Sequence, residues 1–515
     1  MVLWAVLYAC LLLAVAASIT WPMGRDQGIF AWVAEVIAEG GFPYTDAWEV
    51  KGPATFLPYV LAHLALGRNQ WGIRLVDAIL FATAGLFCWR CLVSLGARRG
   101  AVLAPWLFGA WYWQLGYWHT AQADGWMAFL LLGVLSILCS DGGAKSTFAG
   151  VGLGALIGIG TLLKPIFGVY FVLPILLTPW APGRREASWW RWPTSVAVGF
   201  LLTIGLGLLW LSVGGASGEM LKIQFGFASF VHQGAHSYSI SEHLGFLFRF
   251  ATRAEYVVAM PLVWIGLTSL WRRNRRLAGI NVAAIILTVA ILALQSKYWL
   301  YHLTPLLAPL ALLFGIGVDA TQRALRGQSN QADSVDFNSR RLAHALLAVI
   351  IVINLAALWP SVAQAGRTLT GRISREDYSQ WFDRHQSDFS LSDISAAARY
   401  LRERTTEQET VQVWAFDPLI NYVSARRSPT RFGYLYPLVG GDRNPYQTEW
   451  RREFMQVLRA GPPTYVVVGR ADRNNLMSKT SLQYLEDFPE FRSYLLEAYR
   501  VEAEAGRYMI MRRKD

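Results

Sequence analysis

Acidic side chains and a lysine lie close together directly after the first apolar segment of the chain. The stretch over residues 24–53 reads GRDQGIFAWVAEVIAEGGFPYTDAWEVKGP and contains Asp26, Asp46, Glu49 and Lys51. Ionisable groups beside a membrane span are costly unless a function retains them. A carboxylate at a hydroxyl can act as a general base, and a lysine can bind a phosphate. The stretch is therefore a candidate catalytic loop, with a solvated connector as the alternative.

A second carboxylate, Asp124, follows the sequence YWHTAQA just outside the predicted third span. It could orient an acceptor or, with Asp26, help to hold a divalent ion, because hard cations prefer carboxylate oxygens. Both residues have a structural alternative, since aspartate is a preferred residue at the start of a helix. Asp26 would then cap a helix over residues 27–38, and Asp124 would cap the fourth span.

Basic and aromatic residues at predicted span ends could stabilise the charge of a phosphate leaving group. The candidates are Lys51, Arg74, Lys164, Lys297, Tyr298, Tyr301 and His302. For each of them singly, the alternative is a side chain that extends to lipid headgroups or belongs to an interfacial aromatic belt. Arg74 could also pair with Asp77, because the two are spaced i, i+3 on a helix.

The segment 215–255 combines histidines with aromatic side chains. His232 and His236 are spaced i, i+4, and His243 follows. This spacing suits metal binding on a helix, but a third ligand is not evident, and we do not expect a metal site there. The aromatic residues favour a lid or a helix that lies in the membrane interface.

Composition indicates a membrane bundle as the element that positions these residues. The 515 residues are 54% hydrophobic and 16% charged, with a mean hydropathy of +0.30. The net charge of +12 is typical of basic cytoplasmic loops and contact with anionic lipid rather than of nucleic-acid binding. The four cysteines lie in apolar segments and indicate neither a disulfide framework nor a zinc motif.

Apolar runs predict about eleven spans. They lie roughly at 1–22, 73–95, 101–118, 125–140, 147–163, 167–181, 194–214, 256–271, 277–294, 302–318 and 342–359. Residues 54–67 are read as a helix along the outer membrane surface. The first segment lacks a basic start, so we expect a retained first helix rather than a signal peptide.

Basic residues predict the orientation of the spans. They cluster in alternate loops, at Arg98 and Arg99, Lys145, Arg184 to Arg191, Arg272 to Arg276 and Arg323 to Arg341. The positive-inside rule places these loops and the N-terminus in the cytoplasm. The first loop (23–72), the loop at Asp124 and the loop 215–255 then face outward.

Residues 360–515 change to a charged composition without long apolar runs. Helical patterns at 391–404 and 446–460 alternate with short strand-like runs, namely Val411 to Phe416, Tyr465 to Val468 and Tyr508 to Met511. We therefore predict a mainly α, polytopic bundle over 1–359 and a small extracytoplasmic α/β domain over 360–515. The domain has no phosphate loop, catalytic serine motif or metal signature, which favours a supporting or acceptor-recognising role.

The first loop resembles that of GT-C glycosyltransferases, and above all family 39, the type of the protein O-mannosyltransferases and the lipid A aminoarabinose transferase. The likeness rests on Asp26 after the first span, the Pro43-Tyr44-Thr45-Asp46 turn and the element Trp48-Glu49-Val50-Lys51-Gly52-Pro53. Lys164-Pro165 and Tyr301-His302 are similar to two further family elements. The chain departs from the family at Gln27, where Asp-Glu is usual, and at Gly52, where Lys-Pro-Pro is usual.

The resemblance implies a glycosyltransferase that moves a hexosyl or pentosyl group, with inversion, from a polyprenyl-phosphate donor to the hydroxyl of a glycan, lipid or protein acceptor. Asp26 would be the catalytic base and Asp124 the second acidic residue. The basic and aromatic candidates above would bind the lipid phosphate, and Gln27, Asp46 and Glu49 would bind the acceptor or support the site. A bacterial inner membrane is the expected location.

Two other classes of function remain open. A flippase or transporter of lipid-linked sugars would also carry ionisable residues, but it would show a central polar pathway and often internal repeats. A membrane scaffold would present its external domain to a binding partner.

Overall fold

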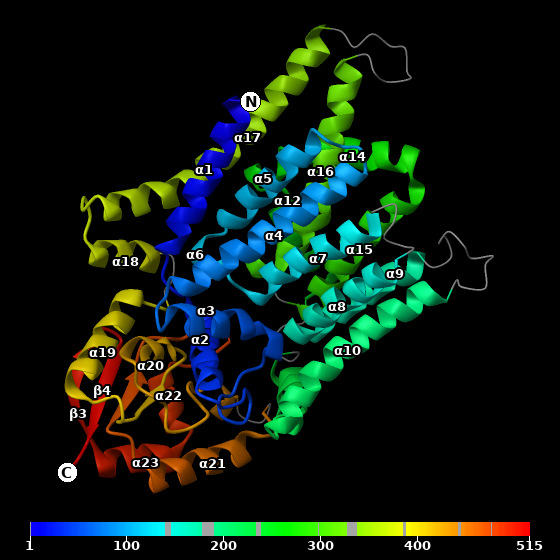
Figure 1. The fold of residues 1–515 in the computed structure, drawn as a ribbon. Coiled ribbons are helices and arrows are strands. Elements are labelled where there is room, and N and C mark those ends of the chain that lie inside the picture. Colours follow the sequence, from blue (N-terminus) through cyan, green and yellow to red (C-terminus); the bar gives the residue numbers. More distant parts are fainter. Residues whose placement is uncertain are drawn as a thin grey trace. The chain divides into compact units, whose positions relative to one another are not determined.

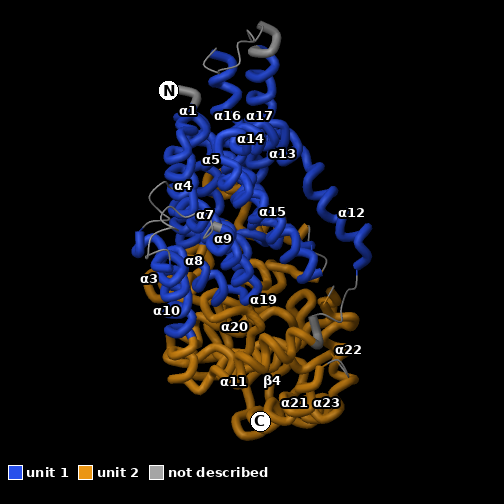
Figure 2. Tube along the Cα trace, turned by 90° about the vertical axis from the view of Figure 1, so that its right-hand side faces the viewer, with its two compact units in different colours: residues 1–20, 74–207, 238–363 blue, residues 21–73, 208–237, 364–515 orange. Residues whose placement is uncertain are grey.

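The computed structural model describes residues 2–139, 146–177, 190–232, 238–296, 298–326, 337–384, 388–440, 444–474 and 476–515. Most of these residues are helical, and one small sheet is formed by residues near the C-terminus (Figure 1). The chain forms two compact units, which Figure 2 shows in different colours. The first unit contains residues 1–20, 74–207 and 238–363, and the second contains 21–73, 208–237 and 364–515.

The first unit is a helix bundle. Its longer helices are α1 (Val2–Ile19), α4 (Gly72–Ser94), α5 (Gly100–Trp113), α7 (Ala123–Cys139), α8 (Thr147–Leu163), α10 (Arg191–Val213), α14 (Met260–Arg273), α15 (Arg275–Gln295), α16 (Thr304–Leu325) and α17 (Phe337–Leu369). Shorter helices are α6 (Gly116–His119), η3 (Pro165–Phe171), α9 (Val172–Leu177), α12 (Ile240–Ala251), α13 (Ala254–Val257) and η6 (Leu300–Leu303). The helices α10 and α17 also contribute residues to the second unit.

Small residues let helices of this bundle approach each other closely. A Cβ atom at Gly266 of α14 would lie 1.8 Å from the carbonyl oxygen of Leu313 in α16. A Cβ atom at Gly317 of α16 would meet Leu262 of α14 in the same way. Close backbone approach at glycine is typical of helix pairs in membranes, where hydrophobic burial does not drive association.

In the described residues, six helices are long and apolar enough to cross a membrane. They span Gly72–Ser94, Arg191–Val213, Ala254–Arg273, Arg275–Gln295, Leu300–Leu325 and Arg341–Leu369. The other predicted spans correspond to α1, α5, α7, α8 and the pair η3 and α9. A helix was predicted over residues 54–67, and the structure has the short helix η1 (Pro53–Thr55) and the helix α3 (Leu57–Leu66) there.

The sheet of the second unit has the strand order β1-β2-β4-β3. The strands are β1 (Val411–Trp414), β2 (Tyr465–Gly469), β3 (Tyr499–Ala505) and β4 (Tyr508–Arg513). β1 and β2 are parallel, whereas β4 is antiparallel to both β2 and β3. The three predicted strands are confirmed. β3 was missed because it is an edge strand in which charged residues interrupt the apolar ones and only the first side chain is buried.

The other elements of this unit are helical. Those from the C-terminal residues are α18 (Arg375–Asp383), α19 (Leu391–Arg404), α20 (Leu419–Ser424), η7 (Tyr436–Leu438), α21 (Gln447–Ala460), α22 (Ser481–Glu486) and α23 (Pro489–Ala498). Those from earlier residues are α2 (Arg25–Ala38), α3, α11 (Ser217–Leu221) and the π-helix η5 (Lys222–His232). The helices predicted at 391–404 and 446–460 are confirmed as α19 and α21.

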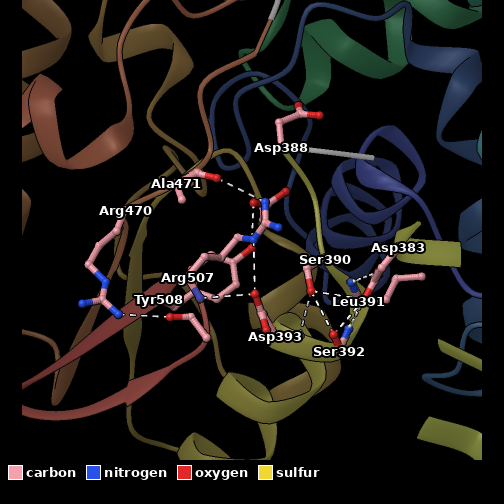
Figure 3. Close-up of polar contacts among 12 residues, drawn as sticks. Asp383, Asp388, Ser390, Leu391, Ser392, Asp393, Arg470, Ala471, Arg507 and Tyr508 are labelled. Carbon is pink, nitrogen blue, oxygen red and sulfur yellow. Dashed lines mark hydrogen bonds and ion pairs between the residues drawn. The ribbon is translucent and has the colours of Figure 1, made fainter. Parts of the chain in front are cut away.

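Carboxylates order the start of α19 (Figure 3). Asp383 accepts hydrogen bonds from the backbone N–H of Leu391 at 2.6 Å and from the hydroxyl of Ser392 at 2.7 Å. Asp393 accepts one from Nε of Arg507 at 3.2 Å, which joins α19 to the β3–β4 hairpin. These bonds fix the first turn of α19.

The first loop packs on the C-terminal residues within the second unit. The backbone N–H of Trp48 donates to the carbonyl oxygen of Arg431 at 2.8 Å. A Cβ atom at Gly28 would lie 2.7 Å from Cβ of Leu419, so α2 and α20 are in close contact. The compact units therefore divide the chain differently from the ranges 1–359 and 360–515, because the first loop makes its contacts with residues far along the sequence.

Candidate active site

Asp26 lies in the first turn of α2 and is half-buried. The residue that precedes the helix is Gly24, whose backbone N–H donates to the side-chain oxygen of Gln27 at 2.5 Å. The alternative role of Asp26 as the helix cap is therefore wrong, and α2 begins two residues earlier than predicted. The Gln27 side chain caps the N-terminus of α2 by accepting the hydrogen bond from Gly24. Asp26 retains the favourable interaction of a carboxylate with a helix N-terminus.

Arg25, directly before Asp26, is a buried cation that the sequence analysis missed. Its guanidinium contacts Asp417 at 3.0 Å and Asp388 at 2.6 Å, and it also donates to the carbonyl oxygen of Asp388. Asp417 accepts a further hydrogen bond from Tyr508 at 2.8 Å. Burial alone would lower the pKa of Arg25, but the two carboxylates outweigh it and raise that pKa. The network anchors the start of α2 to the C-terminal residues.

Glu49 is a buried carboxylate with a neutral partner. The hydroxyl of Tyr434 donates to Glu49 Oε2 at 2.5 Å, and the backbone N–H of Lys51 donates to Oε1 at 3.2 Å. The pKa of Glu49 is raised to about 7: burial raises it most, Tyr434 and Lys51 lower it, and the charge of Asp26 contributes to the rise. Because the charge of Asp26 acts on Glu49, both carboxylates belong to one electrostatic neighbourhood of the second unit.

The backbone of Lys51 is held on both sides. Its carbonyl oxygen accepts hydrogen bonds from the Tyr44 hydroxyl at 2.8 Å and from Nε2 of Gln224 at 3.0 Å. Asp46 stays within the preceding turn, where it accepts a hydrogen bond from the backbone N–H of Phe42 at 2.7 Å. The Pro-Tyr-x-Asp turn thus shapes the loop that presents Lys51.

In the first unit, Asp124 and Lys164 form an ion pair. Asp124 lies in the first turn of α7 and is buried, and Lys164 follows the last residue of α8. The Lys164 Nζ atom lies 2.9 Å from Asp124 Oδ1 and donates to Gln295 Oε1 at 2.5 Å. Residues from three helices therefore meet at this pair.

Arg74 and Asp77 hold the segment that leads into α7. Arg74 donates to the Thr120 hydroxyl and to the carbonyl oxygen of Tyr117, each at 3.0 Å. Asp77 accepts hydrogen bonds from Tyr112 at 2.9 Å, from the Trp126 indole at 2.8 Å and from the backbone N–H of Ala121 at 3.2 Å. Both Arg74 and Asp77 are fully buried, and both form hydrogen bonds with the 117–121 segment, which they therefore hold in place.

The aromatic candidates of the first unit lie close together in the sequence. Tyr301 and His302 are buried in η6, with ring centroids 4.3 Å apart. Tyr298 stacks on Phe246 of α12, with centroids 4.4 Å apart, and contacts His243. Lys297, His236 and the side chain of His232 lie outside the described residues. Within the described part of the chain, no group of three or more His, Cys, Asp or Glu side chains could hold a metal ion.

The structure thus groups the predicted site residues by unit. Gln27, Asp26, Asp46, Glu49 and Lys51 belong to the second unit, whereas Asp124, Lys164, Arg74, Tyr298, Tyr301 and His302 belong to the first. The partners that the sequence did not reveal, such as Asp417 and Tyr434, are ordinary polar residues far from their contacts along the chain.

The fold defined by these observations is a polytopic helix bundle with a small C-terminal α/β region. No protein-family model matches the sequence, and no curated protein matches it. The chain is similar to solved structures of ArnT from Cupriavidus metallidurans. The apo structure has 16% identity, covers 98% of this chain and 97% of its own, and has a TM-score of 0.62.

The ArnT structure bound to undecaprenyl phosphate has 16% identity, 99% and 97% coverage and a TM-score of 0.63. The Archaeoglobus fulgidus oligosaccharyltransferase tethered to an acceptor peptide has 13% identity, covers 90% of this chain and 69% of its own, and has a TM-score of 0.52. These likenesses confirm the predicted GT-C type of fold.

Proposed function

We propose that this protein is an integral membrane glycosyltransferase that uses a polyprenyl-phosphate sugar as donor. The observation that carries the proposal is the position of Asp26, in the first turn of a helix that the buried Arg25 network anchors, with no role as helix cap. The ArnT structure of the same fold was solved with undecaprenyl phosphate, which supports a lipid phosphate as the leaving group.

In the proposed reaction, Asp26 accepts the proton of the acceptor hydroxyl while the oxygen attacks the anomeric carbon of the sugar. The bond between that carbon and the phosphate oxygen breaks, and the phosphate leaves with the electron pair. A single displacement of this kind inverts the configuration. Lys51, in the same unit as Asp26, is proposed to stabilise the charge of the lipid phosphate.

The role of Asp124 follows from its ion pair with Lys164. A divalent ion at Asp124 would have to replace the Lys164 ammonium, so we assign Asp124 to positioning that cation. Arg74 is assigned to holding the 117–121 segment, because its guanidinium already donates within the protein. The proposed location is a bacterial inner membrane, with the N-terminus in the cytoplasm and the acceptor outside it.

Mass spectrometry of cell-envelope glycans tests the proposal in a deletion strain complemented with variants. Wild-type protein should restore a missing sugar, whereas Asp26→Asn should lower its formation about 10²–10⁴-fold at equal protein level. The matched control is Glu39→Gln, an exposed carboxylate at the C-terminal end of α2 that pairs with Arg427, and it should leave sugar transfer unchanged. A scaffold would tolerate Asp26→Asn, and a flippase would move lipid-linked sugar across vesicles without forming a glycosidic bond.

A further inference from the structure

The C-terminal residues contribute a side chain to the neighbourhood of the proposed base. Tyr434 is 2% exposed and lies against Trp48, with ring centroids 5.8 Å apart, and against Phe416, with centroids 5.3 Å apart. Its hydroxyl is thereby aimed at Glu49, which is 3% exposed. The contact is charge-assisted when Glu49 is ionised, and such bonds are stronger than bonds between neutral groups.

Glu49 transmits this contact to Lys51. One carboxylate oxygen accepts from Tyr434 and the other accepts from the backbone N–H of Lys51. The next backbone group, the Lys51 carbonyl, is held by Tyr44 and Gln224. The loop conformation that presents the Lys51 side chain therefore depends on Glu49 acting as an acceptor with both oxygens.

The groups around Glu49 determine the pH range in which it is ionised and can accept hydrogen bonds with both oxygens. Tyr434, Tyr436 and Tyr44 are the neutral titratable groups that face it, Lys51 is the cation, and Asp26 is the neighbouring carboxylate. Burial raises the pKa of Glu49 to about 7, so protonated and ionised forms both exist near neutral pH. The Tyr434 hydrogen bond opposes this rise because it favours the ionised form.

We propose that Tyr434 is a positioning residue of the transfer site, whose hydroxyl keeps Glu49 in the ionised form that orders the backbone of Lys51. The inference rests on the proposed glycosyltransferase function and extends it to a residue of the C-terminal region. Tyr434 acts through Glu49 and does not contact the reacting atoms.

The test is the pH dependence of sugar transfer in membranes that contain wild-type protein, Tyr434→Phe, Glu49→Gln or Tyr465→Phe. Wild-type protein should show an acid limb near about pH 7. Tyr434→Phe should move that limb about one pH unit higher, because a hydrogen bond to the charged form is lost. Glu49→Gln should abolish the limb.

Tyr465→Phe is the matched control, since it removes a 2.8 Å tyrosine–glutamate bond to Glu502 in the same unit, and its limb should stay in place. An active Tyr434→Phe protein with an unmoved limb would overturn the role of Tyr434. If the Tyr434→Phe protein does not reach the membrane, Glu49→Gln provides the test. An acid limb that persists in Glu49→Gln would overturn the proposed role of Tyr434. Absence of transfer by wild-type protein would instead contradict the proposed function.

Discussion

Two buried carboxylates, one in each compact unit, are held by different kinds of partner. Asp124 in the first unit faces the ammonium of Lys164 at 2.9 Å, whereas Glu49 in the second unit faces the neutral hydroxyl of Tyr434 at 2.5 Å. An ion pair balances the charge of a buried carboxylate locally, whereas a phenol only hydrogen-bonds to it. The first arrangement should therefore be sensitive to loss of a charged partner, and the second to pH.

The largest expected effect comes from an ion-pair network in the second unit. It tests whether sensitivity to loss of a charged partner depends on the kind of partner and not on the unit in which the carboxylate lies. Arg25→Met leaves the Asp388 and Asp417 carboxylates without their cation and should lower the free energy of unfolding by about 3–5 kcal/mol. Thermal or denaturant unfolding in detergent measures it.

Arg459→Met is the control for that change, because Arg459 pairs with Glu490 at 2.9 Å on the exposed surface. It should change the free energy of unfolding by less than about 1 kcal/mol. If the two substitutions lowered the free energy of unfolding equally, burial would not make the Arg25 network more stabilising than an exposed ion pair.

Lys164→Met tests the ion pair of the first unit. It removes the ammonium that lies 2.9 Å from the buried Asp124 carboxylate, and we expect a loss of about 3 kcal/mol in the free energy of unfolding. The double variant Lys164→Met/Asp124→Asn should recover part of that loss, because it also removes the negative charge that Lys164 neutralised. A double variant less stable than Lys164→Met would show that the charge of Asp124 is not the reason for the loss.

The pH dependence of stability sharpens the contrast at Glu49. The pKa rises from 4.5 to about 7 on folding, so the folded state binds the proton more tightly. The contribution of Glu49 to stability is therefore full below about pH 4.5 and is lost as the pH rises through about 7. Up to roughly 3 kcal/mol is involved.

Unfolding of wild-type protein and Glu49→Gln over this pH range measures that contribution. The difference between the two free energies of unfolding should shift in favour of the variant as the pH rises. Curves that stay parallel from acid to neutral pH would mean that Glu49 does not titrate in this range.

The smallest effect is expected where the substituted side chain keeps an oxygen that can accept from the same neutral hydrogen-bond donors. Asp77→Asn keeps one acceptor oxygen for Tyr112, Trp126 and Ala121, and it should cost about 1–3 kcal/mol. Asp383→Asn in the second unit is the comparison, because Asp383 also accepts several hydrogen bonds but is partly exposed. A larger loss at Asp383 than at Asp77 would contradict the importance of burial.

Local patterns in the sequence were sufficient for the longer helices and for three of the four strands, but they did not predict short helices such as α20 and α22. Apolar runs correspond to the bundle helices, and the helix over 391–404 has the predicted bounds. These predictions succeed because helix periodicity and hydrophobic length depend on neighbouring residues. β3 escaped because an exposed edge strand carries little hydrophobic pattern.

The sequence by itself determined which residue types the first loop offers for chemistry and that they follow an apolar helix. Only the tertiary structure decided what each of them contacts. Arg25 and Asp417 are 392 positions apart, and Glu49 and Tyr434 are 385 apart. No periodicity connects residues at such separations, because their contact depends on the packing of the whole unit and on the burial that makes a hydrogen bond or charge decisive.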